Sequence, residues 1–349
     1  MNIKSLLLGS AAALVAASGA RAADAVVVAE PEPAEYVRIC DVYGAGYFYI
    51  PGTETCLRVG GYIRLDVSAG DGGRVLDGRS TVDVRDGSVQ DTWKTNTRFA
   101  FRTWTGQETE LGTLKTYTET RFNFANGGPT GTTLNFAWVQ LGGLRLGKDE
   151  SAYDTFIGYA GNVVQDTIIP YGIKDTNLIS YYFDAGNGFT AMASLEQGSG
   201  IDTLDSYAPH VVLGAKYKQG AFALTGVGAY NSVWEEWAGK LRLDVKASSD
   251  LSLFVMGGYG TDDHAATSFY KPWTGNFAVW GGGTYTINDK TAFNAQVSYT
   301  DAKDFAVAAN IAYSPVPGFT VTPEINYFDN FDKSSSDAIG GIVRFQRSF

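Results

Sequence analysis

The sequence predicts an all-β protein, a 16-stranded antiparallel transmembrane β-barrel with a lumen-folded third loop. Three observations lead to this fold. The chain begins with an export signal, alternating apolar and polar residues recur in segments of about ten residues, and the chain ends on Phe349 inside such a segment. A barrel leaves no strand edge in lipid, so its last strand pairs with its first. We therefore expect Phe349 to belong to a terminus that takes part in membrane assembly.

Residues 1–22 have the features of a signal peptide. Lys4 supplies a positive charge, Leu6 to Ala17 form a short apolar core, and Ala20-Arg21-Ala22 is a small-x-small cleavage site. We expect cleavage after Ala22, and the outer membrane of a bacterium as the destination. No later segment has the roughly 18 uninterrupted apolar residues that a membrane helix requires. A mature protein in the membrane must therefore cross it as strands.

Residues 23–55 form a predicted lead-in to the barrel, with Pro31 and Pro33 in a stretch rich in Ala, Val and Glu. Cys40 and Cys56 lie at its end, and a pair of cysteines in an exported protein is most simply a disulfide. The alternative is a metal or redox pair. The absence of a CxxC spacing, and of a nearby histidine, favours the disulfide.

Residues 56–349 carry the alternation expected of barrel strands. Near its start, Leu57, Val59 and Ile63 alternate with polar residues, and near its end Phe319, Val321 and Ile325 do the same. Segments of this kind number sixteen, an even count in the range where a barrel encloses an aqueous channel. The predicted strands are 56–67, 95–105, 112–124, 132–141, 144–148, 177–184, 188–196, 209–218, 221–231, 235–247, 251–260, 276–287, 291–301, 304–314, 318–329 and 338–349.

The predicted connections alternate in length, as an up-and-down barrel demands. Gly142-Gly143 and Gln219-Gly220 mark tight turns, whereas 68–94 and 149–176 are long loops. Pro323 lies inside an otherwise strong strand, where it removes a ladder hydrogen bond. We interpret it as the site of a β-bulge.

Parity within the strands separates a lipid-facing set from a lumen-facing set. Phe99 and Phe101 share one face, and Arg98 and Arg102 share the other. An arginine facing lipid near the membrane centre costs about 2–4 kcal/mol, so the arginines are assigned to the lumen. Adjacent strands then carry a basic row. The predicted pore-lining basic residues are Arg58, Arg64, Arg98, Arg102, Arg121 and Arg145, with Lys240 and Arg242 on the far wall.

The long loop 149–176 supplies the opposite charge. A loop of this length in a compact fold is usually functional, and carboxylates facing a row of arginines impose a transverse field on passing solutes. The alternative is that these acids are solvated outside the barrel and the arginines pair locally with Glu119, Asp66 or Asp244. The predicted acidic residues of the constriction loop are Asp149, Glu150, Asp154, Asp166 and Asp175.

Long runs of residues spread over the whole chain carry a resemblance to a known family. The runs are 1–10, Tyr43 to Val59, Glu110 to Thr116, Val316 to Glu324, and Gly341 to Phe349. In these runs the chain resembles the alphaproteobacterial porin family, and it is closely similar to the major outer-membrane porins of Brucella and relatives. The resemblance implies a sixteen-stranded barrel with a third external loop folded into the lumen, a homotrimer in contact with outer-membrane lipids and lipopolysaccharide, and passive diffusion of ions and small hydrophilic solutes. Arg347 departs from the aromatic residue that many porins have at this position.

Composition and charge restrict the function classes. Charged residues make up 18% of the chain, below the roughly 25% of soluble proteins, and there are 42 glycines. The net charge of −10 argues against nucleic-acid partners and favours cations, whereas the arginine row favours anions locally. The sequence does not settle ion preference, and we expect cation selectivity. We expect no cofactor and no metal.

Other function classes are weaker. A hydrolase would need a nucleophile beside a base, and only His210 and His264 are available. A soluble secreted binding protein fits poorly with the terminal Phe349. The stronger alternative is a substrate-specific channel, for example for sugars, with aromatic residues stacked along the lumen. Trp104, Trp280 and Phe328 have the inner parity but are scattered singly, which favours wall packing.

Overall fold

The computed structural model describes residues 38–71, 77–172, 175–261 and 268–349. The chain divides after Arg38, and the unit Ile39–Phe349 contains every strand of the described residues. The predicted signal peptide, residues 23–37 of the predicted lead-in, and His264 lie outside the described residues.

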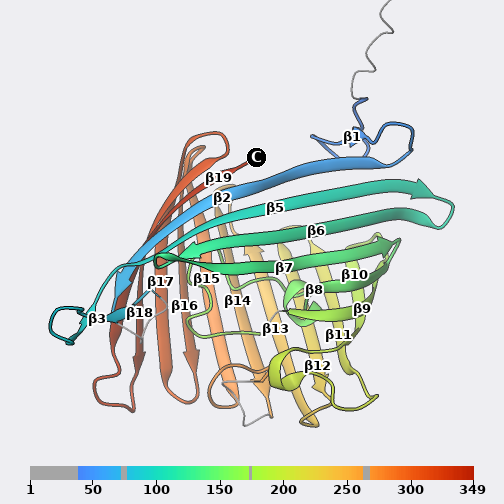
Figure 1. The fold of residues 1–349 in the computed structure, drawn as a ribbon. Coiled ribbons are helices and arrows are strands. Elements are labelled where there is room, and N and C mark those ends of the chain that lie inside the picture. The colour runs from blue at the N-terminus through green and yellow to red at the C-terminus, as the bar shows by residue number, and fades with distance from the viewer. Residues whose placement is uncertain (1–37, 72–76, 173–174, 262–267) are drawn as a thin grey trace, which may run out of the picture. The chain divides into compact units, whose positions relative to one another are not determined.

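Sixteen antiparallel strands close into a barrel, as predicted. Each strand pairs with the next along the chain, and β19 returns to pair with β2. Figure 1 shows the strands following one another around the barrel, with β19 beside β2. The strands are β2 (Cys56–Gly70), β5 (Lys94–Thr109), β6 (Gly112–Ala125), β7 (Gly128–Leu141), β8 (Leu144–Glu150), β9 (Asp175–Asp184), β10 (Phe189–Glu196), β11 (His210–Gln219), β12 (Phe222–Asn231), β13 (Glu236–Lys246), β14 (Leu251–Gly260), β15 (Phe277–Asn288), β16 (Thr291–Thr300), β17 (Asp304–Val316), β18 (Phe319–Asn330) and β19 (Ala338–Ser348).

Five short elements lie outside this ring. β1 (Phe48–Tyr49) pairs with the start of β2, and β3 (Ser80–Val82) pairs with β4 (Val89–Asp91). The loop 68–94 thus contains a hairpin that sequence periodicity did not reveal. The helix α2 (Ala152–Thr155) follows β8, and the 3₁₀ turn η1 (Gly200–Asp202) follows β10.

The alternation of side chains separates two environments along each strand. In β2, Ile63 is 53% exposed on the outer face, whereas its neighbour Tyr62 is 3% exposed. In β13, Leu241 and Leu243 are exposed, whereas Lys240, which has the opposite parity, is buried. Apolar side chains outside and polar side chains inside are the pattern of a barrel that faces lipid. The parity assignment made from the sequence therefore describes the outer surface correctly.

Pro323 does not form the predicted bulge. Pro323 pairs with Val343 of β19, and the register of β18 runs through this position without a shift. The pairs with β17 skip Pro323 and resume in the same register at Tyr313 and Val321. Proline lacks the N–H that one ladder bond requires, but it fits the extended backbone. The irregularity of this strand pair lies instead between Tyr313 and Val316.

The seam between the first and last strands is closed by backbone and side chains. The N–H of Phe349 donates to the oxygen of Gly61 at 3.1 Å, and the N–H of Gly61 donates back to Phe349 at 3.0 Å. Arg344 binds both carboxylate oxygens of Asp66, at 2.7 and 3.0 Å. Phe349 thus continues the hydrogen-bond ladder between β19 and β2, as expected for an aromatic residue that takes part in closing the barrel.

The predicted disulfide between Cys40 and Cys56 is confirmed, and both cysteines are buried. Ile39 forms a bridge with Phe48, and Tyr49 pairs with Cys56. The loop between the cysteines is therefore held against the start of β2.

The apolar core lies inside the barrel. Tyr153 and Tyr171 of the loop after β8 pack with Trp280 of β15 and Met256 of β14, and all four are essentially unexposed. Phe269, Tyr270 and Trp273, which precede β15, belong to the same cluster. One part of the lumen is therefore filled by apolar packing beneath the loop.

Candidate functional site: the narrowed lumen

The loop that follows β8 turns into the barrel at a buried carboxylate. We define the inner loop as residues 151–172. The side chain of Ser151 accepts a hydrogen bond from the N–H of Tyr153 at 3.1 Å and caps the helix α2. Glu196 of β10 accepts from Ser151 Oγ at 2.7 Å, from the N–H of Ala152 at 2.8 Å and from Tyr270 Oη at 3.0 Å. Glu196 therefore fixes the point where the chain leaves the wall.

The inner loop then crosses to the far wall of the barrel. Its backbone oxygens and N–H groups are bound by side chains from five strands, β13 and β15 to β18, so the prediction of a lumen-folded third loop is confirmed. A loop tied at so many points is held in one position. The contacts are Lys240 Nζ to Tyr171 O at 2.9 Å, Trp280 Nε1 to Ile169 O at 2.9 Å, Gln296 Nε2 to Asp166 O at 2.9 Å, Asn310 Nδ2 to Asn162 O at 3.1 Å, and the N–H of Gln165 to Glu324 Oε1 at 2.7 Å.

Asp77, from the loop after β2, ties the inner loop to a second segment. Its carboxylate accepts from Gln165 of the inner loop and from Asn326 of β18, and its backbone oxygen accepts from Ser68 Oγ at 3.1 Å. Asp77 is fully buried, and burial raises the pKa of this carboxyl although both hydrogen bonds oppose the shift. The loop after β2 thus contributes to the narrowed lumen, which the sequence did not suggest.

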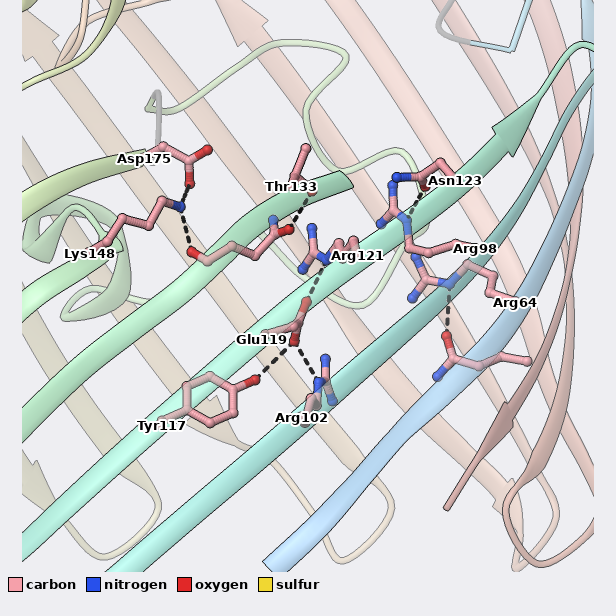
Figure 2. Close-up of polar contacts among 12 residues, drawn as sticks. Arg64, Arg98, Arg102, Tyr117, Glu119, Arg121, Asn123, Thr133, Lys148 and Asp175 are labelled. Atoms are coloured by element: carbon pink, nitrogen blue, oxygen red, sulfur yellow. Dashed lines mark hydrogen bonds and ion pairs between the residues drawn. The ribbon is translucent and has the colours of Figure 1, made fainter. Parts of the chain in front are cut away.

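Four arginines project from three neighbouring strands on the wall opposite these contacts. Arg64 lies on β2, Arg98 and Arg102 on β5, and Arg121 on β6 (Figure 2). Arg64 stands directly across from Arg98 in the strand register. Like charges in this position repel, so the arrangement costs stability and needs another reason to exist.

The partners of these arginines leave most of the positive charge uncompensated. Arg64 Nε donates to the neutral amide of Gln346 at 2.8 Å, and Arg98 Nε donates to Asn123 at 2.8 Å. Arg102 and Arg121 share the single carboxylate of Glu119, which is completely buried between them (Figure 2). Tyr117 donates a further hydrogen bond to Glu119 at 2.9 Å.

A cavity of about 510 Å³ lies beside the basic wall, at the two ends of the inner loop. Arg121 of β6 and Asn135 of β7 line it together with Glu150, which ends β8, and Asp175, which begins β9. Glu150 accepts from Tyr159, and Asp175 pairs with Lys148 at 2.7 Å. These four side chains form the constriction cavity, which is lined by charges of both signs.

Several predicted site residues lie elsewhere. Lys240 and Asp154, expected to face the lumen, form an ion pair at 2.6 Å in which neither side chain is exposed. The prediction that they line the water-filled part is therefore wrong, because the inner loop packs over this part of the wall. Asp149 is buried beside Arg145 at 2.8 Å, and both lie on β8.

The remaining predicted residues have specific partners. Asp166 accepts from Tyr171 within the inner loop. Arg242 pairs with Asp244 at 2.7 Å and also donates to the inner loop. Arg58 lies over the ring of Trp104, 4.6 Å from its centroid. The local pairing that was kept as an alternative is thus found for Arg102 and Arg121 with Glu119 and for Arg242 with Asp244.

His210, the histidine within the described residues, is buried and its ring nitrogens are bonded to backbone groups. His210 opens β11, is completely buried, and bonds through Nε2 to the oxygen of Asp202 at 2.7 Å. Its Nδ1 accepts from the N–H of Ser232 at 3.0 Å, so this nitrogen is engaged by backbone. Among the residues that the structure describes, no group of three His, Cys, Asp or Glu side chains is arranged to hold a metal ion.

Sequence reasoning missed the acids that position the inner loop. Glu196 and Glu324 have the inner parity in their strands, which marks them as polar groups inside the barrel. Their partners are backbone groups far away in the chain, and a single sequence holds no signal for such pairs. Asp77 follows residues 72–76 in a long loop and had no distinguishing pattern.

The fold and this site together define a class. A closed barrel of sixteen strands, apolar outside and polar inside, with a loop folded into its lumen, is a porin-type membrane barrel. The model of the Porin subfamily matches residues 24–346, and the chain belongs to this family.

Relatives and solved structures agree. The porin Omp2b of Brucella suis biovar 1 (strain 1330) and that of Brucella abortus (strain 2308) are each 52% identical over 376 residues, with 100% of both chains covered. The outer-membrane channel DcaP of Acinetobacter baumannii matches with a TM-score of 0.63 at 16% identity, covering 86% of this chain and 99% of that one. The anion-selective porin from Comamonas acidovorans matches at 0.57 and 15%, covering 85% and 100%. At such identities the structures support the fold alone.

Proposed function

We propose that this protein is an outer-membrane channel for passive diffusion of ions and small hydrophilic solutes, with selectivity set at the constriction cavity. The observation that carries the proposal is the cavity itself, because Arg121 of β6 lines it together with the carboxylates of Glu150 on β8 and Asp175 on β9. Family membership supports the channel function, and the polar lining supports passage of hydrated solutes.

A transverse field follows from this arrangement. Of the four arginines on the wall, two share the carboxylate of Glu119 and two bind neutral amides, while Glu150 and Asp175 line the cavity beside Arg121. Rings and rows of charge select ions by sign, and their effect is strongest where the passage is narrow and water is limited. Cations are drawn along the acidic side and anions along the basic side, so the balance of the two sets the ion preference.

The cellular setting is part of the same proposal. An exported barrel of the Porin subfamily resides in the bacterial outer membrane, in contact with lipids and lipopolysaccharide. We infer a homotrimer from family membership. Cross-linking of the purified protein in detergent tests this, with three linked chains expected and a single chain contradicting it.

The first experiment is conductance of the purified protein in a planar bilayer, with the reversal potential measured under a KCl gradient. Glu150→Gln together with Asp175→Asn should shift the reversal potential toward anions. Arg121→Gln should shift it toward cations. Asp289→Asn, an exposed acid in the turn between β15 and β16, is the matched control for loss of one charge. Equal reversal potentials in all variants would remove the constriction cavity from selectivity, and absence of conductance from a folded barrel would contradict the channel.

A further inference from the structure

We propose that the lumen wall carries a binding track for small aromatic carboxylates, a role that rests on the proposed channel function and names a solute class for it. The track consists of Trp104 on β5, Tyr117 on β6 and Trp138 on β7, with Arg58 on β2 at one end and Arg145 on β8 at the other. These five residues are the aromatic track.

The members of the aromatic track stand side by side in the strand register. Arg58 lies opposite Trp104, Trp104 opposite Tyr117, and Tyr117 opposite Trp138. The rings of Trp104 and Tyr117 are stacked, with centroids 5.3 Å apart, and those of Tyr117 and Trp138 are 5.7 Å apart. Trp104 is therefore one member of a continuous row across neighbouring strands, although no other member of the row is near it in the sequence.

The two arginines lie against the ends of this row. The guanidinium carbon of Arg58 is 4.6 Å from the ring centroid of Trp104, and that of Arg145 is 4.2 Å from the ring centroid of Trp138. Arg58 has no hydrogen-bond or ion-pair partner within the described residues. A guanidinium stacked on a ring keeps the N–H donors at its edge available for a carboxylate. The row thus ends in a cation that can still bind an anion.

The aromatic track is accessible, unlike the aromatic residues under the inner loop. Trp104, Tyr117 and Trp138 are only partly buried, whereas Trp280 and Tyr153 are completely covered by packing. Partial burial on the inner parity means that these rings are open toward the lumen. Tyr117 is two residues from Glu119 and bonds to it, so the track adjoins the basic row along β6.

The geometry determines the class of solute. Trp104 and Tyr117 stack on one another, and the two arginines lie over the rings of Trp104 and Trp138, so ring faces are occupied and ring edges are presented. Ring edges are positive and attract the negative face of another aromatic ring in a T-shaped pair. A flat aromatic body with one carboxylate satisfies both features, since its ring meets the edges and its carboxylate reaches an arginine. A sugar would instead need an open ring face for stacking.

The test uses single-channel conductance in KCl with benzoate or cyclohexanecarboxylate added as probes. Both probes carry one carboxylate on a six-membered ring, but only benzoate is aromatic. We expect benzoate to reduce the conductance with a half-saturation concentration about five- to tenfold below that of cyclohexanecarboxylate, the ratio that one aromatic pair supplies. Equal effects of the two probes, or a stronger effect of maltose, would overturn the proposal.

Variants separate this inference from the proposed function. Trp104→Leu and Arg58→Gln should each raise the half-saturation concentration for benzoate at least several-fold. Phe293→Leu removes an aromatic ring from the exposed outer face of β16 and should leave it unchanged. Conductance in KCl alone shows that each variant is folded and open. If the unmodified protein conducts but ignores benzoate, the track fails while the channel stands; if it does not conduct at all, the channel proposal itself fails.

Discussion

Lys240 Nζ lies 2.6 Å from Asp154 Oδ1, and neither side chain is exposed. The pair joins β13 of the far wall to the helix α2 at the start of the inner loop. Nζ also donates to the oxygen of Tyr171 and lies 4.0 Å from the ring centroid of Tyr153. Lys240 and Asp154, which were expected to attract passing ions, thus hold the inner loop in place instead.

Breaking this pair should destabilise the protein. Lys240→Met leaves the Asp154 carboxylate buried without its cation, and Asp154→Leu leaves the ammonium without its anion. Removal of one partner from a buried ion pair costs about 3–5 kcal/mol. Chemical unfolding followed by tryptophan fluorescence should report a loss of this size for each single variant.

The double variant Lys240→Met/Asp154→Leu is the matched control. Because no uncompensated charge remains, its loss of unfolding free energy should be clearly smaller than the sum of the two single losses. Additive losses would mean that the two residues do not act as a pair. Asp154→Leu should also change the reversal potential less than Glu150→Gln does.

Glu119 should tune the charge of the basic row. Glu119→Gln removes the carboxylate that Arg102 and Arg121 share, so their positive charges are no longer compensated. We expect the reversal potential to shift toward anions, in the direction opposite to Arg121→Gln. Ser80→Ala in the hairpin loop, which changes no charge, is the control. An unchanged reversal potential would show that the row does not face the conducting path.

Acidification should increase the contribution of Asp77 to the stability of the folded protein. Its pKa in the folded protein is raised by burial, so folding takes up a proton. The free energy of unfolding should therefore rise as the pH falls through the raised pKa, and stop changing below the unfolded value of about 3.9. Asp77→Asn lacks this group.

The comparison of the two proteins isolates this effect, because all other carboxylates titrate in both. The difference in unfolding free energy between the unmodified protein and Asp77→Asn is measured from neutral pH to about pH 3. It should change only between the raised pKa of folded Asp77 and the unfolded value of about 3.9. A difference that is constant with pH would show that Asp77 ionises normally in the folded protein.

Loss of the disulfide should destabilise the region before β2. Cys40 and Cys56 are 16 residues apart, and closing a loop of this length contributes about 3 kcal/mol. We expect Cys40→Ser/Cys56→Ser to unfold at lower denaturant concentration and to be cut by protease between residues 41 and 55. Reduction of the unmodified protein should reproduce this cleavage, and an intact loop after complete reduction would contradict it.

The strands could be predicted closely because each one is half exposed to lipid and half to the lumen. This produces a period of two that any single segment displays. β8 was predicted as short, and it ends at Glu150 because the chain there turns inward at Glu196. The hairpin β3–β4 lies outside the ring, lacks that division, and was missed.

The site was less predictable than the wall. Parity placed Lys240 inside the barrel, and Glu196 and Glu324 share the inner parity of their strands, but the partners of all three depend on the path of the inner loop. That path is fixed by contacts such as Asn310 to Asn162, 148 residues apart. The alternation of a strand says which face a side chain occupies and nothing about what will cover it.

The seam between β19 and β2 sets the order of events in assembly. Arg344 holds Asp66 across 278 residues of chain, and Phe349 exchanges hydrogen bonds with Gly61. Contacts of such separation form slowly, and here no other strand can replace β19. A chain without these 11 residues would keep two open edges, unable to enter lipid and prone to aggregate. The strand that closes the ring is therefore the one that commits the protein to the membrane, because without it two rows of unpaired backbone groups would face lipid.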